Sequence, residues 1–167
     1  MRLGQTTLTA FSLAILAASL AACGETAEDA NGEEVAVSGE MDVIEARQDN
    51  FEEIGDAFKV IRDQLEGNNP DFALISANAE TIQTNAGKIP DFFTEVSSMD
   101  TGADTEALAV IWEKPEDFAA AHQRLMDASG VLVEAAASQD AAAVGEAVKG
   151  LGASCKNCHD TFRLDDD

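Results

Sequence analysis

The sequence predicts an all-α protein, an antiparallel four-helix bundle, on three observations. Apolar residues recur in steps of three, four and seven over long segments, which is the spacing of one face of a helix. Aromatic residues make up only 5% of the 167 residues, alanine is abundant, and no segment alternates apolar with polar side chains as a half-buried strand would. Short turns and one longer connection separate the periodic segments, as in a bundle with one crossover.

Residues 1–22 are predicted to be a lipoprotein signal peptide. A positive start precedes a short apolar run that is too short to span a bilayer comfortably. Leu20-Ala21-Ala22-Cys23 resembles the bacterial lipobox, in which cleavage precedes the cysteine and its thiol receives the lipid. Cys23 is therefore the expected lipidation site of an exported protein held on the periplasmic side, and Gly24 after it favours the outer membrane. The alternative is an ordinary signal peptide cut near Ala22, which leaves a free thiol.

Residues 23–40 carry small and acidic side chains without helical apolar spacing, so we expect an acidic flexible tether there. The folded domain is expected to occupy residues 41–167. Its first helix is predicted over residues 42–65. One face of that helix carries the apolar residues Ile44, Phe51, Ile54, Phe58, Ile61 and Leu65.

The second helix is predicted to follow a turn at residues 67–70, with Asn69 as its N-cap and Pro70 at its first position. It is expected to end at Pro90, because proline lacks the amide hydrogen that would continue the helix. The longer connection over residues 91–114 is expected to cross over and to pack on the bundle.

Pro115 is predicted to open the third helix, and Asp140 is predicted to cap the fourth. The inward face of the third helix carries Phe118, Ala121, Leu125, Ala128 and Leu132. The buried side of the fourth is expected to carry Val144, Ala147, Val148, Leu151, Cys155, Cys158, His159 and Phe162.

The charge of the chain limits its partners. Ten Lys and Arg residues stand against 32 Asp and Glu residues, a formal net charge of −22. A chain this acidic repels phosphate backbones and anionic lipid, so we expect no nucleic-acid binding and membrane contact by the lipid anchor only. The same charge suits a basic redox partner, whose approach it would steer.

Residues 155–159, Cys-Lys-Asn-Cys-His, have the C-x-x-C-H spacing at which haem c is attached. Positions three apart share one face of a helix, so both sulfurs can reach the two vinyl groups of one porphyrin edge. His159 is then held under the iron as its axial ligand. We expect one covalently attached haem c per chain, on Cys155 and Cys158, near the C-terminal end of the last helix. With Cys23 lipidated, no thiol is left over.

A C-x-x-C pair could also be a redox disulfide or half of a zinc site. Zinc would need further ligands, and His122 is the only other His or Cys in the predicted domain. His122 is interpreted as a surface or boundary histidine. A thioredoxin-like motif begins a helix after a strand, whereas this motif lies near the end of the last predicted helix.

The chain resembles the cytochrome c′ family, which consists of exported four-helix bundles with the haem motif close to the C-terminus. The resemblance covers roughly residues 42–163. It is carried by Arg47-Gln48-x-x-Phe51, by Lys88-Ile89-Pro90, by Ile111-Trp112 before Phe118, and by the run from Gly152 through Cys155, Cys158 and His159 to Arg163.

The resemblance implies the remaining site residues. Phe51 takes the position at which six-coordinate relatives such as cytochrome c-556 have a ligating Met, so a five-coordinate, high-spin iron is implied. Arg47 is implied to pair with a haem propionate, and Arg163 to stand beside the proximal pocket near His159. The residues implied to help wall the haem pocket are Phe93, Trp112 and Phe118.

The resemblance also implies a function, the binding of NO, with CO weaker and O₂ poor. The sequence offers no nucleophile, acid–base pair or substrate pocket for catalysis, so we do not expect an enzyme. The alternative is a periplasmic electron-transfer cytochrome that shuttles electrons between redox partners, and a purely structural role for the haem is a third interpretation. A homodimer through the first two helices is common in the family.

Overall fold

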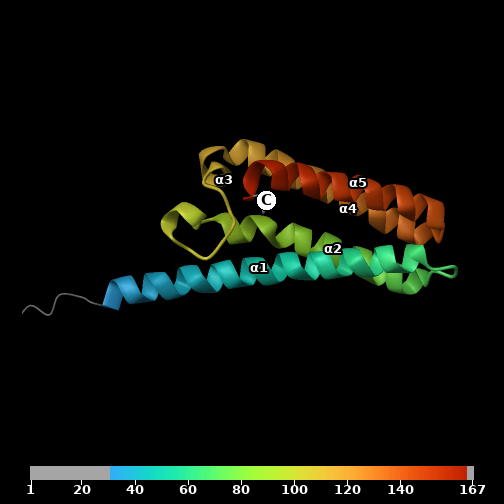
Figure 1. Cartoon of the computed structure of the whole chain (residues 1–167), viewed down its shortest axis with the longest axis horizontal. Coiled ribbons are helices and arrows are strands. Elements are labelled where there is room, and N and C mark those ends of the chain that lie inside the picture. The colour runs from blue at the N-terminus through green and yellow to red at the C-terminus, as the bar shows by residue number, and fades with distance from the viewer. Residues whose placement is uncertain (1–30, 165–167) are drawn as a thin grey trace, which may run out of the picture. The chain divides into compact units, whose positions relative to one another are not determined.

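The computed structural model describes residues 31–164, which form an antiparallel bundle of four long helices (Figure 1). The long helices are α1 (Asn31–Glu66), α2 (Phe72–Lys88), α4 (Pro115–Ser138) and α5 (Ala141–Phe162). The crossover from α2 to α4 contains the 3₁₀ helices η1 (Ile89–Phe93) and η2 (Met99–Thr101) and the short helix α3 (Val110–Glu113). The predicted fold class and the predicted packed crossover are both confirmed. Over the described residues, no helix combines the length and apolarity needed to cross a membrane.

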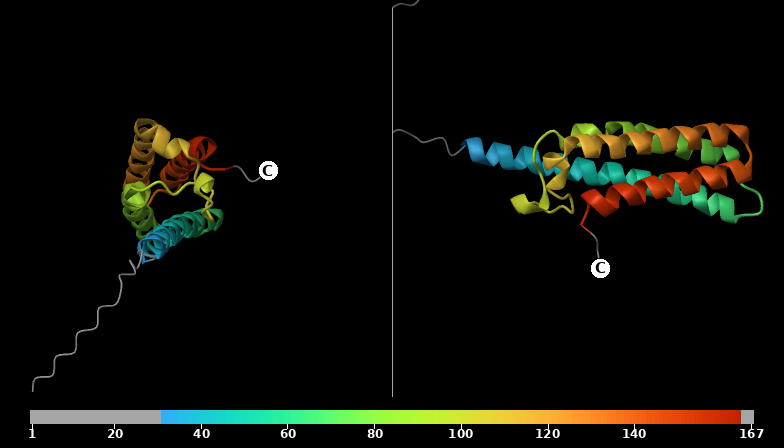
Figure 2. Two further views of the ribbon diagram at one scale, coloured as in Figure 1. Left: turned by 90° about the vertical axis from the view of Figure 1, so that its left-hand side faces the viewer. Right: turned by 90° about the horizontal axis from the view of Figure 1, so that it is seen from above.

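The helices pack as two hairpins. α1 packs against α2, α4 against α5, and α2 joins the hairpins through its contact with α4 (Figure 2). Short turns link the partners within each hairpin, as expected for antiparallel neighbours. α1 and α5, in contrast, make few contacts with each other. The functional site described below lies on that side of the bundle.

The core between the helices is aliphatic. Its fully buried large side chains are Ile61, Ile75, Ile82, Leu132, Val144 and Leu151. Each of them lies on a helix face whose apolar residues recur in steps of three, four or seven. Full burial of one such side chain contributes about 1.5–3 kcal/mol. A smaller cluster of Ile111, Ala121 and Phe162 fastens the crossover to α4 and α5.

The first helix is longer than predicted. α1 begins at Asn31, so residues 31–40, predicted as part of a flexible tether, are helical. Extending a helix forms one hydrogen bond per residue fixed and avoids the cost of nucleation. The predicted signal peptide (1–22), the lipidation site Cys23 and the first part of the tether lie outside the described residues.

The start of α2 also differs from the prediction. The N-cap is Asp71, whose carboxylate accepts hydrogen bonds from the backbone N–H groups of Ala73 (3.0 Å) and Leu74 (3.1 Å). Asp and Asn are nearly equal as N-caps, so local chemistry allowed either start. The structure places Pro70 one residue before the cap, so it is not the first helical residue.

The other predicted helix ends are confirmed. α2 ends before Pro90, where the chain tightens into η1. Pro115 opens α4, and Asp140 caps α5 by accepting hydrogen bonds from the backbone N–H groups of Ala142 (2.8 Å) and Ala143 (3.3 Å).

Candidate cofactor site

A cavity of about 710 Å³ opens between α1, α4, α5 and the crossover. Its deeper walls are apolar, with Ile54, Leu125 and Leu151 among the lining residues. Cofactor sites typically enclose about 300–1,000 Å³ and carry a small number of placed polar groups. The cavity therefore has the size and lining of a site for a prosthetic group.

α5 supplies the reactive groups of the cavity. It runs unbroken through the C-x-x-C-H motif, and Cys155, Cys158 and His159 all line the cavity. Both cysteines are free and half-buried. His159 was expected on the buried side of the helix but is exposed, because it borders the open cavity and does not face the aliphatic core. The motif thus presents two thiols and one imidazole to a single space.

Burial favours the neutral form of both thiols. Burial raises the pKa of the Cys155 thiol above its ordinary value. Burial, and next the neighbouring Cys155, raise the pKa of Cys158 to about 11, against a smaller lowering by the Arg124 guanidinium. Ser154, which also lines the cavity, has a buried hydroxyl oxygen with no hydrogen-bond partner among the described residues. An unpaired buried hydroxyl costs about 1–3 kcal/mol, which favours a site that takes up a further group.

α1 contributes a buried cation. Arg47 is 3% exposed, and its Nη1 donates to Ser97 Oγ (3.0 Å) while its Nη2 donates to Ser97 O (3.2 Å) and Thr105 Oγ1 (2.7 Å). Its guanidinium carbon lies 4.8 Å from the centre of the Phe93 ring. All these partners are neutral, and burial lowers the pKa of Arg47. A buried charge is stabilised most by an opposite charge, so the cavity edge at Arg47 suits an anionic group.

Aromatic rings form much of the remaining wall. Phe51, one turn after Arg47 on α1, lines the cavity and is 36% exposed. Phe93 and Phe118 line it as well, with ring centres 4.9 Å apart. The sequence-predicted residues Phe51, Phe93 and Phe118 are therefore brought together around one space.

Trp112 does not lie on this wall, contrary to the expectation. It is not among the residues that line the cavity, and its ring packs on Phe93 with the ring centres 5.8 Å apart. Its indole Nε1 donates a hydrogen bond to the Phe93 carbonyl oxygen (3.0 Å). Trp112 therefore supports a wall residue from the crossover without lining the cavity.

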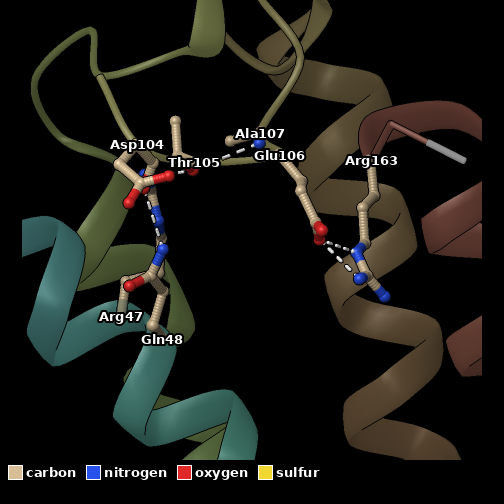
Figure 3. A network of polar contacts seen from close by, with 7 residues as sticks. All are labelled: Arg47, Gln48, Asp104, Thr105, Glu106, Ala107 and Arg163. Atoms are coloured by element: carbon tan, nitrogen blue, oxygen red, sulfur yellow. Dashed lines mark hydrogen bonds and ion pairs between the residues drawn. The ribbon is translucent and has the colours of Figure 1, made fainter. Parts of the chain in front are cut away.

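Arg163 closes the α5 side of the cavity together with Glu106 of the crossover. The two side chains form an ion pair, and both residues line the cavity (Figure 3). Backbone hydrogen bonds run alongside, from Leu108 N to Phe162 O (3.0 Å) and from Leu164 N to Glu106 O (2.9 Å). Arg163 is thus at the cavity edge, as the resemblance implies, but with an acidic partner that the sequence did not indicate.

The sequence did not indicate several polar lining residues, among them His122, Thr105 and Glu106. His122 is half-buried, as a boundary histidine should be, but it lines the cavity. Its Nε2 lies 2.9 Å from Ala86 O and carries the hydrogen, because a carbonyl oxygen can only accept. Its position four residues after Phe118, on the same helical face, could have revealed it. Thr105 and Glu106 lie in the irregular crossover, where no periodicity could have found them.

The alternatives to haem gain no support from the structure. Within residues 31–164, no group of three or more His, Cys, Asp or Glu side chains is placed to hold a metal ion, so a zinc site finds no ligand set there. The C-x-x-C pair lies in the last two turns of α5, not at the start of a helix as in a thioredoxin-like motif.

Comparison with known proteins identifies the family of this chain. The family model for cytochrome c′ matches residues 42–163. The chain belongs to the cytochrome c′ family. It is 35% identical to the cytochrome c′ of Pararhodospirillum photometricum over 120 residues, which cover 72% of this chain and 94% of the relative. It is 38% identical to a cytochrome c-556 of Agrobacterium fabrum over 123 residues, which cover 72% of this chain and 80% of the relative.

Solved structures agree with this family. The nitric oxide complex of a variant cytochrome c′ from Alcaligenes xylosoxidans is similar with a TM-score of 0.68 and 27% sequence identity, over 75% of this chain and 97% of that one. Cytochromes c′ bind haem c, and the residues around this cavity fit that group. They include two thiols and an imidazole from one helix, a buried cation and an unpaired hydroxyl.

Proposed function

We propose that this protein carries one haem c and binds NO at the iron, with CO binding more weakly. Cys155 and Cys158 would hold the porphyrin covalently, and His159 would be the axial ligand. The bound haem would supply an iron centre that takes up a diatomic ligand. The residues of this chain position that centre, shape the space around it and limit what else can reach the iron.

The observation that carries this proposal is the wall that α1 presents to the cavity. At the position where a cytochrome c-556 would offer a thioether, α1 offers Phe51, which cannot ligate iron. No methionine lines the cavity as far as the described residues go, and His122 is engaged through Nε2 by Ala86 O. A haem held by His159 would therefore keep one side open.

The same wall supports the choice of ligand. Bound O₂ takes on negative charge and needs a hydrogen-bond donor, whereas NO and CO stay nearly neutral. Phe51 offers no donor, and the amide of Gln48, on the preceding turn, already donates to Asp104 O (3.0 Å). The nitric oxide complex of the similar Alcaligenes protein is consistent with this choice. Arg47 would pair with a haem propionate. That carboxylate would supply the negative charge that the neutral hydrogen-bond partners of Arg47 do not carry.

We propose that residues 1–22 are removed, that Cys23 is lipidated, and that the chain is anchored on the periplasmic side, with the outer membrane favoured. A homodimer through α1 and α2 belongs to the same proposal. No catalytic activity is proposed.

A second function, electron transfer to a basic partner, is favoured by the net charge of −22. Absorption spectra of the haem-loaded chain, ferric and ferrous, with and without NO, separate the two functions. A high-spin ferrous spectrum that shifts on NO addition is expected. A low-spin, six-coordinate spectrum indifferent to NO would refute the open site and leave electron transfer as the better proposal.

A further inference from the structure

Gly55 lies on the cavity face of α1 between two phenyl rings. It comes four residues after Phe51 and three before Phe58, and all three residues line the cavity. Residues three and four apart share one face of a helix, so the three positions follow one another along the same wall. Between the two rings the wall is therefore the backbone of α1, with no side chain of its own.

Neither the backbone nor a neighbouring side chain requires glycine at position 55. Gly55 lies inside α1, and the glycine with a positive φ among the described residues is Gly102. A Cβ added at Gly55 would meet no neighbouring atom of the described chain within 4 Å. After proline, glycine is the least favourable residue in a helix interior. The cost of glycine at this position is thus not explained by any contact that a side chain would disturb.

The other glycines of the long helices differ from Gly55. Gly152 also lines the cavity, from α5, but a Cβ there would lie 3.6 Å from Phe58 Cζ. Gly145 of α5 has nothing within 4 Å of an added Cβ, but it does not line this cavity. Among the glycines whose surroundings the structure describes, Gly55 alone combines a place in the cavity wall with open space in front of it. That space therefore belongs to the cavity.

We propose that Gly55 is a specificity-determining residue, which keeps a space open next to Phe51 and so limits the size of the second axial ligand that the iron accepts. This inference rests on the proposed function, in which Phe51 marks the open side of the iron. A phenyl ring crowds that side, so a bound ligand needs room beside the ring, and the missing side chain one turn away supplies it. A diatomic ligand needs little of this room, and a larger ligand needs more.

Substitutions of increasing size at position 55 test the inference in the haem-loaded full chain. The variants are Gly55→Ala and Gly55→Leu, and the matched controls are Gly145→Ala and Gly145→Leu, because alanine and leucine both favour a helix. The probes are CO and ethyl isocyanide, which bind ferrous iron through carbon and differ in size. We expect the affinity for CO to fall in the order Gly, Ala, Leu at position 55. For ethyl isocyanide, Gly55→Leu should lower the affinity by about ten- to two-hundredfold, the range that one extra methylene produces in an apolar pocket.

Haem content and thermal stability provide a readout that does not depend on ligand binding. Since neither added Cβ meets a neighbour, Gly55→Ala and Gly145→Ala should keep the wild-type haem content and should raise Tm to a similar extent. Loss of haem from Gly55→Ala, but not from Gly145→Ala, would show that the porphyrin itself fills the space. That result would overturn the inference.

The ratio of the two affinities separates this inference from the proposed function. If the wild-type iron is high-spin and binds NO, but the ratio of CO to ethyl isocyanide affinity is the same in the Gly55 and Gly145 variants, the inference alone is wrong. A wild-type spectrum that is low-spin and indifferent to NO refutes the proposed function, and it is recorded before any variant is made.

Discussion

Replacement of Phe51 by Met tests the α1 wall of the cavity directly. Phe51 is the side chain that lines the cavity from α1 one turn after the buried Arg47. A thioether at this place can ligate iron, whereas a phenyl ring cannot. We therefore expect Phe51→Met to convert the haem-loaded protein from high-spin to low-spin and to weaken its response to NO.

The structure indicates that this substitution costs little folding stability. Phe51 is 36% exposed, so its substitution opens no closed cavity in the core. Exchanges between apolar side chains of similar volume cost below about 1.5 kcal/mol. For a domain of this size such a loss lowers Tm by no more than roughly 10 °C. The variant should thus remain folded at room temperature, and a change of spin state cannot be ascribed to unfolding.

The assay compares ferric and ferrous absorption spectra of the wild-type protein and two variants. Phe58→Met is the matched control, because Phe58 lines the same cavity from α1 two turns further along. Only the substitution at Phe51 should give a low-spin spectrum. If Phe51→Met stays high-spin, or if Phe58→Met is equally effective, the assignment of Phe51 to the open side of the iron is wrong.

Two further predictions concern stability and the thiols. Ile82→Ala should lower the free energy of unfolding, measured in thermal or denaturant melts, by about 2–5 kcal/mol, because Ile82 is 0% exposed. Leu74→Ala, at a residue of the same helix that is 41% exposed, should lower it far less. Equal losses for the two variants would contradict the assigned core. In the haem-free chain with Cys155→Ser, alkylation of Cys158 should be slow at neutral pH, because burial favours the neutral thiol. The alkylation rate should rise with pH, and the midpoint of that rise should lie well above 9.0, the ordinary pKa of a cysteine thiol. A midpoint near 9.0 would refute the effect of burial on Cys158.

Helix spans could be predicted because each helix repeats its apolar residues at a fixed interval. The caps were predicted in part. Asp140 caps α5 as expected, whereas Asp71 caps α2 in place of Asn69, a residue type that is nearly equal as an N-cap. The helical residues 31–40 were missed because helix extension needs no apolar face of its own.

The sequence by itself determined the bundle, the C-x-x-C-H motif and the common face of its two thiols, because these follow from helix geometry within one segment. Tertiary structure decided what meets that motif across the cavity. Arg47 meets Ser97 from 50 positions away, and Arg163 meets Glu106 from 57. Both contacts depend on the position that the irregular crossover takes when it packs on the bundle. Because the crossover has no helical periodicity, its sequence carries no local signal of the residues that it will contact.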